Sequence, residues 1–175
     1  SPMDELIEQT KLVLEGKKVK SKNFTKQIAF NAIPHIDLFS DDGYTKEELK
    51  MANETKKILG SDINLTATCV RLPISVSHSE SVNIKFKKSF TVDKVKDALD
   101  NFEGCKVIDK RIDGGYSTPL DAEGKNETFI SRIRYDKTIE NGLNLWIVSD
   151  NLLRGAALNS VEIAETLIKE NFYGK

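Results

Sequence analysis

The sequence has little of what disulfide-stabilised and metal-organised folds require. Its 175 residues include two cysteines, four prolines and one tryptophan. Cys69 and Cys105 lack the spacing of a metal site, and a single pair of cysteines does not form a disulfide framework. We therefore expect reduced, packed thiols, as is usual in a cytoplasmic protein, and no metal centre.

Strong charge and long apolar runs are also missing. The formal net charge is −1, so the chain lacks the excess positive charge that favours binding to nucleic acid or to a membrane surface. No apolar run reaches the roughly 18 residues of a transmembrane helix, and the first residues do not read as a secretory signal. We expect a cytoplasmic protein with neither a nucleic-acid nor a membrane partner.

Alternating apolar residues predict a set of strands. Thr66, Thr68 and Val70 alternate with Ala67 and Cys69, which is the two-residue period of a strand. This strand ends or bends at the following proline, because proline cannot donate to a ladder. The predicted strands are Leu65–Leu72, Val82–Phe86, Cys105–Asp109, Thr128–Tyr135 and Leu143–Ser149, with a weaker one at Lys26–Ile33.

Helical periods and caps predict four helices. Thr45 and Glu48 have the spacing of a capping box, in which each side chain accepts the other residue's free backbone amide. Ser1 before Pro2 and Thr91 before Val92 are further start signals. The predicted helices are Met3–Glu15, Thr45–Leu59, Val92–Phe102 and Asn151–Phe172, and 111–126 reads as a loop. Together these elements predict an α+β fold, with a mixed, largely antiparallel sheet covered by helices on one face.

Two candidate functional residues lie at the connection between the first two strands. Arg71 ends one strand, and its guanidinium can hold a carboxylate through two parallel hydrogen bonds. His78 begins the next strand and can give or take a proton near neutral pH. The alternatives are an arginine extended along the sheet edge and a surface histidine beside serines.

Opposite charges on one helix face form a second candidate group. Glu47, Lys50, Glu54 and Lys57 share a face at about 100° per residue. Such a face can bind a substrate that carries both charges, or it is a solvated, salt-bridged surface. No phosphate-binding glycine motif accompanies it.

Several motifs resemble one enzyme family, the aspartate-β-semialdehyde dehydrogenases. They occur in the family's order and cover nearly the whole chain. They are Cys69-Val70-Arg71-Leu72-Pro73 with His78-Ser79-Glu80-Ser81-Val82, then 31–37, 47–50, 54–59 and 149–159. The resemblance implies the fold of the semialdehyde dehydrogenase dimerisation domain. Residues 1–154 would be the dimerisation and substrate-binding domain, and residues 155–175 a terminal helix that packs on a dinucleotide-binding domain in the family.

The resemblance also implies roles for individual residues. Arg71 would hold the substrate's α-carboxylate, and His78 would be the acid/base. Glu47 would bind the amino group, Lys50 the phosphoryl group, and Asn159 would lie toward the cofactor. The family enzyme uses NADPH to reduce 4-aspartyl phosphate to aspartate semialdehyde and phosphate, which supplies lysine, threonine and methionine biosynthesis.

Two parts of that chemistry are not found in these 175 residues. The resemblance places the nucleophilic cysteine and the main NADP site before residue 1, so we expect this chain alone to be inactive. Cys69 precedes Arg71 on the strand and is expected to be a packed thiol. We expect a homodimer that binds a small-molecule substrate. A non-catalytic dimerisation or ligand-binding module is the alternative, and an acyl-phosphate or acyl-CoA reductase with a changed substrate is a third.

Overall fold

The computed structural model describes residues 1–60 and 62–172 and divides the chain into two compact units, residues 1–75 and 76–175. Each unit is described by itself. Residues 173–175 of the predicted terminal segment lie outside the described residues. Within the described ranges, no helix is long and apolar enough to cross a membrane.

The first unit begins with α1, Pro2–Leu14, which Ser1 caps as predicted, and the Asp4 side chain completes a capping box. Polar residues are the buried ones on this helix: Glu5 and Gln9 are buried, whereas Leu14 is 74% exposed. Glu5 accepts hydrogen bonds from the backbone amides of residues 22 and 23, and Gln9 accepts from those of residues 28 and 29. Polar side chains therefore join α1 to the segment that follows it.

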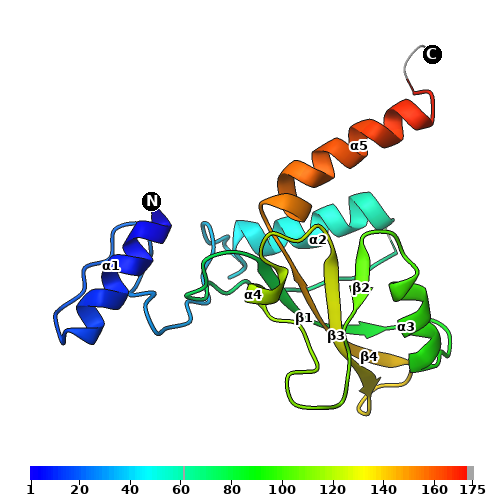
Figure 1. Cartoon of the computed structure of the whole chain (residues 1–175), viewed down its shortest axis with the longest axis horizontal. Helices are drawn as coiled ribbons and strands as arrows, with labels where there is room; N and C mark the ends of the chain where they lie inside the picture. Colours follow the sequence, from blue (N-terminus) through cyan, green and yellow to red (C-terminus); the bar gives the residue numbers. More distant parts are fainter. Residues whose placement is uncertain (61, 173–175) are drawn as a thin grey trace. The chain divides into compact units, whose positions relative to one another are not determined.

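The second helix of this unit, α2, spans Lys46–Leu59 (Figure 1). The predicted capping box is confirmed: the Thr45 amide donates to Glu48 at 2.8 Å, and the Glu48 amide donates to the Thr45 hydroxyl at 3.4 Å. The helix ends at Gly60, whose φ of 115° suits a residue without a side chain. Local signals alone were enough to predict this helix.

Two predicted strands of the first unit are wrong. Lys26–Ile33 and Leu65–Leu72 form no ladder, and only Ile33 and Arg71 pair, in one isolated antiparallel bridge. Exposure along 65–70 still alternates between half-buried and exposed. The two-residue period was thus present, but a strand also needs a neighbouring chain segment to pair along its length.

The second unit is built on a four-stranded sheet in the order β1-β4-β3-β2. The β1–β4 and β4–β3 pairs are antiparallel, whereas β2 and β3 are parallel. This confirms the predicted α+β class and the mixed, largely antiparallel sheet. The strands are β1 His78–Lys85, β2 Cys105–Val107, β3 Thr128–Asp136 and β4 Gly142–Ser149.

Apolar residues form clusters on both faces of this sheet. Leu145 belongs to one cluster and Val148 to the other, and these two side chains point to opposite sides of β4. Helix α3, Val92–Asp100, packs on the face that carries Leu145. On the other face, Val148 packs against Ala122 of a short helix, α4, Pro119–Ala122. This helix lies inside the segment predicted to be a loop, so the second face is also partly covered.

The predicted terminal helix is interrupted near its start. A π-helical turn, η1, spans Leu153–Ala157, and the α-helix α5 follows at Leu158–Lys169. No residue of α5 is buried, and the helix extends away from the sheet of its own unit (Figure 1). Its apolar residues include Val161, Ile163 and Ile168, each more than half exposed.

Candidate functional site

The backbone of Arg71 is held in place by two hydrogen bonds. Its amide donates to the Ile33 carbonyl at 2.9 Å, and its carbonyl accepts from the Ile33 amide at 3.0 Å. Ile33 is only 3% exposed, so this bridge joins Arg71 to the buried part of the first unit. The Arg71 residue itself is exposed, and its guanidinium is available to a ligand carboxylate.

The chain bends directly after Arg71. The Ile74 amide donates to the Leu72 carbonyl at 2.9 Å, which closes a three-residue turn around Pro73. No continuous strand therefore joins Arg71 to His78, as the prediction of a bend at Pro73 required. A straight strand would have sent these two side chains to opposite faces, since they are an odd number of residues apart.

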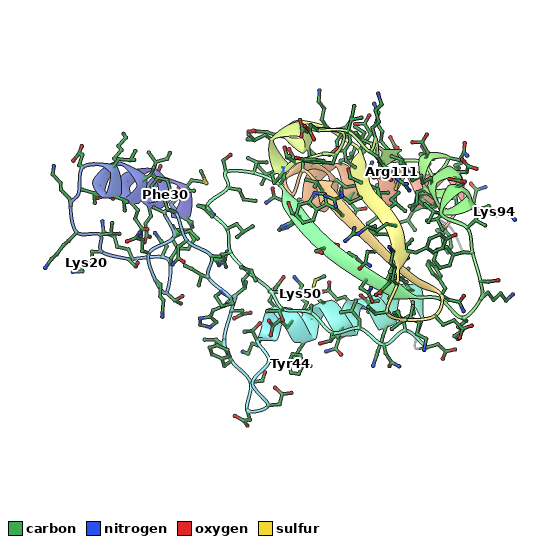
Figure 2. The ribbon with its side chains drawn as sticks, turned by 90° about the horizontal axis from the view of Figure 1, so that it is seen from below. Lys20, Phe30, Tyr44, Lys50, Lys94 and Arg111 are labelled. Carbon is green, nitrogen blue, oxygen red and sulfur yellow. The ribbon has the colours of Figure 1, made fainter. Side chains whose placement is uncertain are left out.

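Glu47 and Lys50 lie one turn apart on α2. The Lys50 ammonium is 3.6 Å from a Glu47 carboxylate oxygen, and both side chains are partly exposed. Figure 2 labels Lys50 on this helix. An exposed pair of this kind contributes at most about 1 kcal/mol to stability, so both charges remain available to a polar ligand.

Glu48 joins α2 to the segment that carries Arg71. One of its oxygens accepts the Thr45 amide, and the other accepts the Cys69 amide at 2.9 Å. These backbone amides, first that of Thr45 and then that of Cys69, hold the pKa of the Glu48 carboxyl below its usual range. Because Cys69 lies two residues before Arg71, this one carboxylate links Glu47 and Lys50 to the backbone of Arg71.

The role of Glu48 was only half visible in the sequence. Its spacing from Thr45 predicted a helix cap, but its second partner lies 21 residues away and left no local signal.

Cys69 is half-buried, and burial, followed by the nearby Glu48 and Glu47 carboxylates, raises the pKa of its thiol. A raised pKa disfavours the thiolate, which fits the expectation of a packed cysteine.

A surface hollow of about 390 Å³ adjoins this part of the first unit. Its lining includes Tyr44, Thr45, Glu48 and Thr66, and Tyr44 and Thr66 are hydrogen-bonded at 3.2 Å. None of the predicted substrate-binding residues lines it. The hollow is therefore a neighbour of the candidate site and not the site itself.

His78 and Asn159 lie in the second unit. His78 is the first residue of β1, is exposed, and pairs with Ser149 at the end of β4. Asn159 is exposed near the start of α5. The roles implied by the resemblance would bring His78 to the same substrate as Arg71, Glu47 and Lys50; this involves both units and stays a prediction. The other histidine, His35, stacks on Phe39 with 4.3 Å between the ring centres.

Comparison with known proteins identifies the family. Residues 1–154 match the model of the semialdehyde dehydrogenase dimerisation domain. The chain belongs to this family. It is similar to an aspartate-semialdehyde dehydrogenase of Aquifex aeolicus, with 47% identity over 96% of this chain and 50% of the relative. The chain thus spans about half the length of the curated relatives it matches.

Solved structures of relatives have the same fold. Aspartate semialdehyde dehydrogenase II of Vibrio cholerae, complexed with ASA, matches with a TM-score of 0.90 and 40% identity over 95% of this chain and 49% of that chain. The Candida albicans enzyme, solved with NADP, matches with a TM-score of 0.67 and 26% identity over 83% of this chain and 46% of that chain. The matched structures therefore include one complexed with ASA and one with NADP.

Proposed function

We propose that this chain is the substrate-binding and dimerisation half of an NADP-dependent aspartate-semialdehyde dehydrogenase. The observation that carries the proposal is the link from Glu48 to the Cys69 amide, which joins a helix bearing Glu47 and Lys50 to the strand-like segment bearing Arg71. Within one unit, an arginine whose backbone is held in place, a carboxylate and an ammonium suit a ligand that carries carboxylate, ammonium and phosphoryl groups.

Arg71 would hold the α-carboxylate in a bidentate grip, which fixes both the position and the angle of the substrate. Glu47 would accept hydrogen bonds from the substrate ammonium, and Lys50 would neutralise phosphoryl charge. His78 would exchange a proton with the reacting group. We propose that the terminal segment from residue 155, whose described helix α5 ends at Lys169, packs on the dinucleotide-binding half and that Asn159 lies toward the cofactor.

NADP, when bound, supplies the hydride chemistry of the reaction. On this chain only Asn159 is proposed to approach the cofactor, and its exposed position in α5 leaves it accessible. In the family pattern, both the nucleophilic cysteine and most of the dinucleotide site belong to the other half of the enzyme. We therefore expect the 175-residue chain by itself to reduce no NADP⁺ with aspartate semialdehyde and phosphate.

The decisive experiment joins this chain to the amino-terminal half of the Aquifex aeolicus relative and assays phosphate-dependent NADP⁺ reduction. Arg71→Lys should raise KM for aspartate semialdehyde about tenfold or more, because one ammonium cannot reproduce a bidentate grip. Arg111→Lys, which changes an exposed loop arginine in the same way, is the matched control. Equal KM values for the two variants would contradict the proposed role of Arg71.

A non-catalytic binding module of the same fold is the second candidate. It is supported by the family match itself, which is to a dimerisation domain over residues 1–154. The two candidates differ in one outcome: a hybrid that binds aspartate semialdehyde but never reduces NADP⁺ would support the binding module. A hybrid that preferred acyl-CoA substrates would instead support a related reductase.

A further inference from the structure

Ser77, the residue before His78, is held by two segments distant in sequence. Its amide donates to Asn151 Oδ1 at 2.8 Å, and its hydroxyl donates to the Pro119 carbonyl at 3.0 Å. Ser77 is only 6% exposed. The backbone that leads into His78 is thus fixed by α4 and by the turn after β4, all within the second unit.

The conformation of Ser77 is one that needs such support. Its φ of 84° lies in the left-handed region, which residues with a side chain seldom adopt. Residues in this region persist only where the surrounding structure holds them, and they concentrate at functional sites. The angle at Ser77 sets the direction in which the chain, and therefore the His78 side chain, enters β1.

Asn151 is itself held in place by its neighbour Asp150. One oxygen of the buried Asp150 accepts the Leu152 and Leu153 amides at 2.7 and 3.0 Å, and the other accepts the Gly124 amide at 2.8 Å. These amides, first that of Gly124, hold the pKa of Asp150 below its usual range although burial opposes this. Three hydrogen bonds to Asp150 therefore hold the turn from which the Asn151 amide oxygen reaches Ser77.

We propose that Asn151 is a positioning residue for His78, acting through the Ser77 amide. The inference rests on the proposed acid/base function of His78. Asn151 contacts the backbone and not the imidazole, so its effect reaches the reaction only through the placement of His78. The backbone of His78 is held by its pairing with Ser149 in the β-ladder. The hydrogen bond from the Ser77 amide to Asn151 holds the residue that precedes His78.

The test uses the hybrid enzyme described above. Asn151→Ala removes the acceptor and should lower kcat about 10- to 100-fold, the usual effect of misplacing a catalytic group by about 1 Å. KM for aspartate semialdehyde should change less than twofold, because Arg71 lies outside this network. Asn151→Asp keeps the acceptor oxygen and should restore most of kcat. Asn126→Ala, at an exposed loop asparagine, is the matched control.

A double variant separates this inference from the proposed function. If Asn151 acts through His78, Asn151→Ala should slow the His78→Asn enzyme no further. An additive loss would overturn the inference, as would an unchanged kcat in Asn151→Ala beside a reduced kcat in His78→Asn. An unchanged kcat in His78→Asn would instead overturn the acid/base function itself.

A measurement on the 175-residue chain gives a readout that does not depend on activity. The imidazole NMR signals of His78 should shift or broaden in Asn151→Ala and return in Asn151→Asp, while those of His35 stay in place. His78 signals that are identical in Asn151→Ala and the unchanged chain would contradict the proposal. Loss of all dispersed signals would show unfolding and would also count against a role confined to His78.

Discussion

At the scale of single residues, three buried carboxylates join segments that are distant in the sequence. Glu5, Glu48 and Asp150 each accept backbone amides from segments more than 15 residues away. An ionised carboxylate accepts such bonds strongly, because its two oxygens are charged and can serve several donors. At these three positions a carboxylate joins distant segments, as apolar contacts do in the core of the sheet.

The low pKa of Glu48 predicts a pH-dependent contribution to stability. A carboxyl whose pKa is lower in the folded state stabilises the fold above its unfolded pKa, and this stabilisation is lost as the pH falls through the folded pKa. Glu48→Gln should therefore be less stable than the unchanged chain at pH 7, and the difference should shrink in acid. Urea unfolding between pH 3 and pH 7 measures it.

The matched control for this prediction is Glu54→Gln, which changes an exposed glutamate of the same helix. Its stability should follow that of the unchanged chain at every pH. A Glu48→Gln deficit that stayed constant from neutral pH into acid would contradict the assignment, because it would reflect altered packing and not the titration of Glu48.

At the scale of elements, α5 contributes no described residue to the apolar clusters of the second unit. It has no buried residue, and Val161, Ile163 and Ile168 leave about half or more of their surface in water. A short helix without packing is marginally stable, because its formation fixes many backbone angles for few hydrogen bonds. The family resemblance implies that this helix packs on the dinucleotide-binding half, and we propose that this contact covers these side chains.

We expect hydrogen exchange to separate α5 from the sheet. In the isolated chain, amides of residues 161–168 should exchange much faster than those of 143–148 in β4, which lies between two other strands. In the hybrid enzyme, the α5 amides should become protected. Equal protection of α5 and β4 in the dilute isolated chain would mean that the helix packs on its own unit or on a second copy.

At the scale of the whole molecule, the second unit holds a sheet face that its own helices leave partly open. This face carries a hollow of about 410 Å³, lined by Ser81, Arg132, Arg134 and Trp146 among others. Arg132 lies where the β3–β4 register shifts, and no acidic residue lines the hollow. An open face with arginine and tryptophan has the composition of protein interfaces.

We propose that the chain forms a two-fold homodimer through this sheet. Light scattering at tens of micromolar should give twice the 19.6 kDa mass of one chain. Arg132→Glu should shift the mass toward the monomer, because a two-fold interface repeats each change of charge, whereas Arg111→Glu in an exposed loop should not. A monomeric mass for the unchanged chain would contradict the proposal.

The sequence by itself determined the elements whose signals are local. The capping box at Thr45 and the cap at Thr91 each predicted a helix that the structure contains. Ordered motifs also determined the family and the candidate residues Arg71, His78, Glu47, Lys50 and Asn159. A cap or a turn can be predicted from the sequence because the residues that form it lie within four positions of one another.

Only the tertiary structure decided the contacts that reach across the chain. The strand predicted at Leu65–Leu72 forms just one bridge, because no second segment lies along it. The Glu48 bond to the Cys69 amide and the Asn151 bond to the Ser77 amide span 21 and 74 residues. A hydrogen bond of this kind depends on where two segments meet in space, and that meeting is set by packing, which the local sequence does not encode.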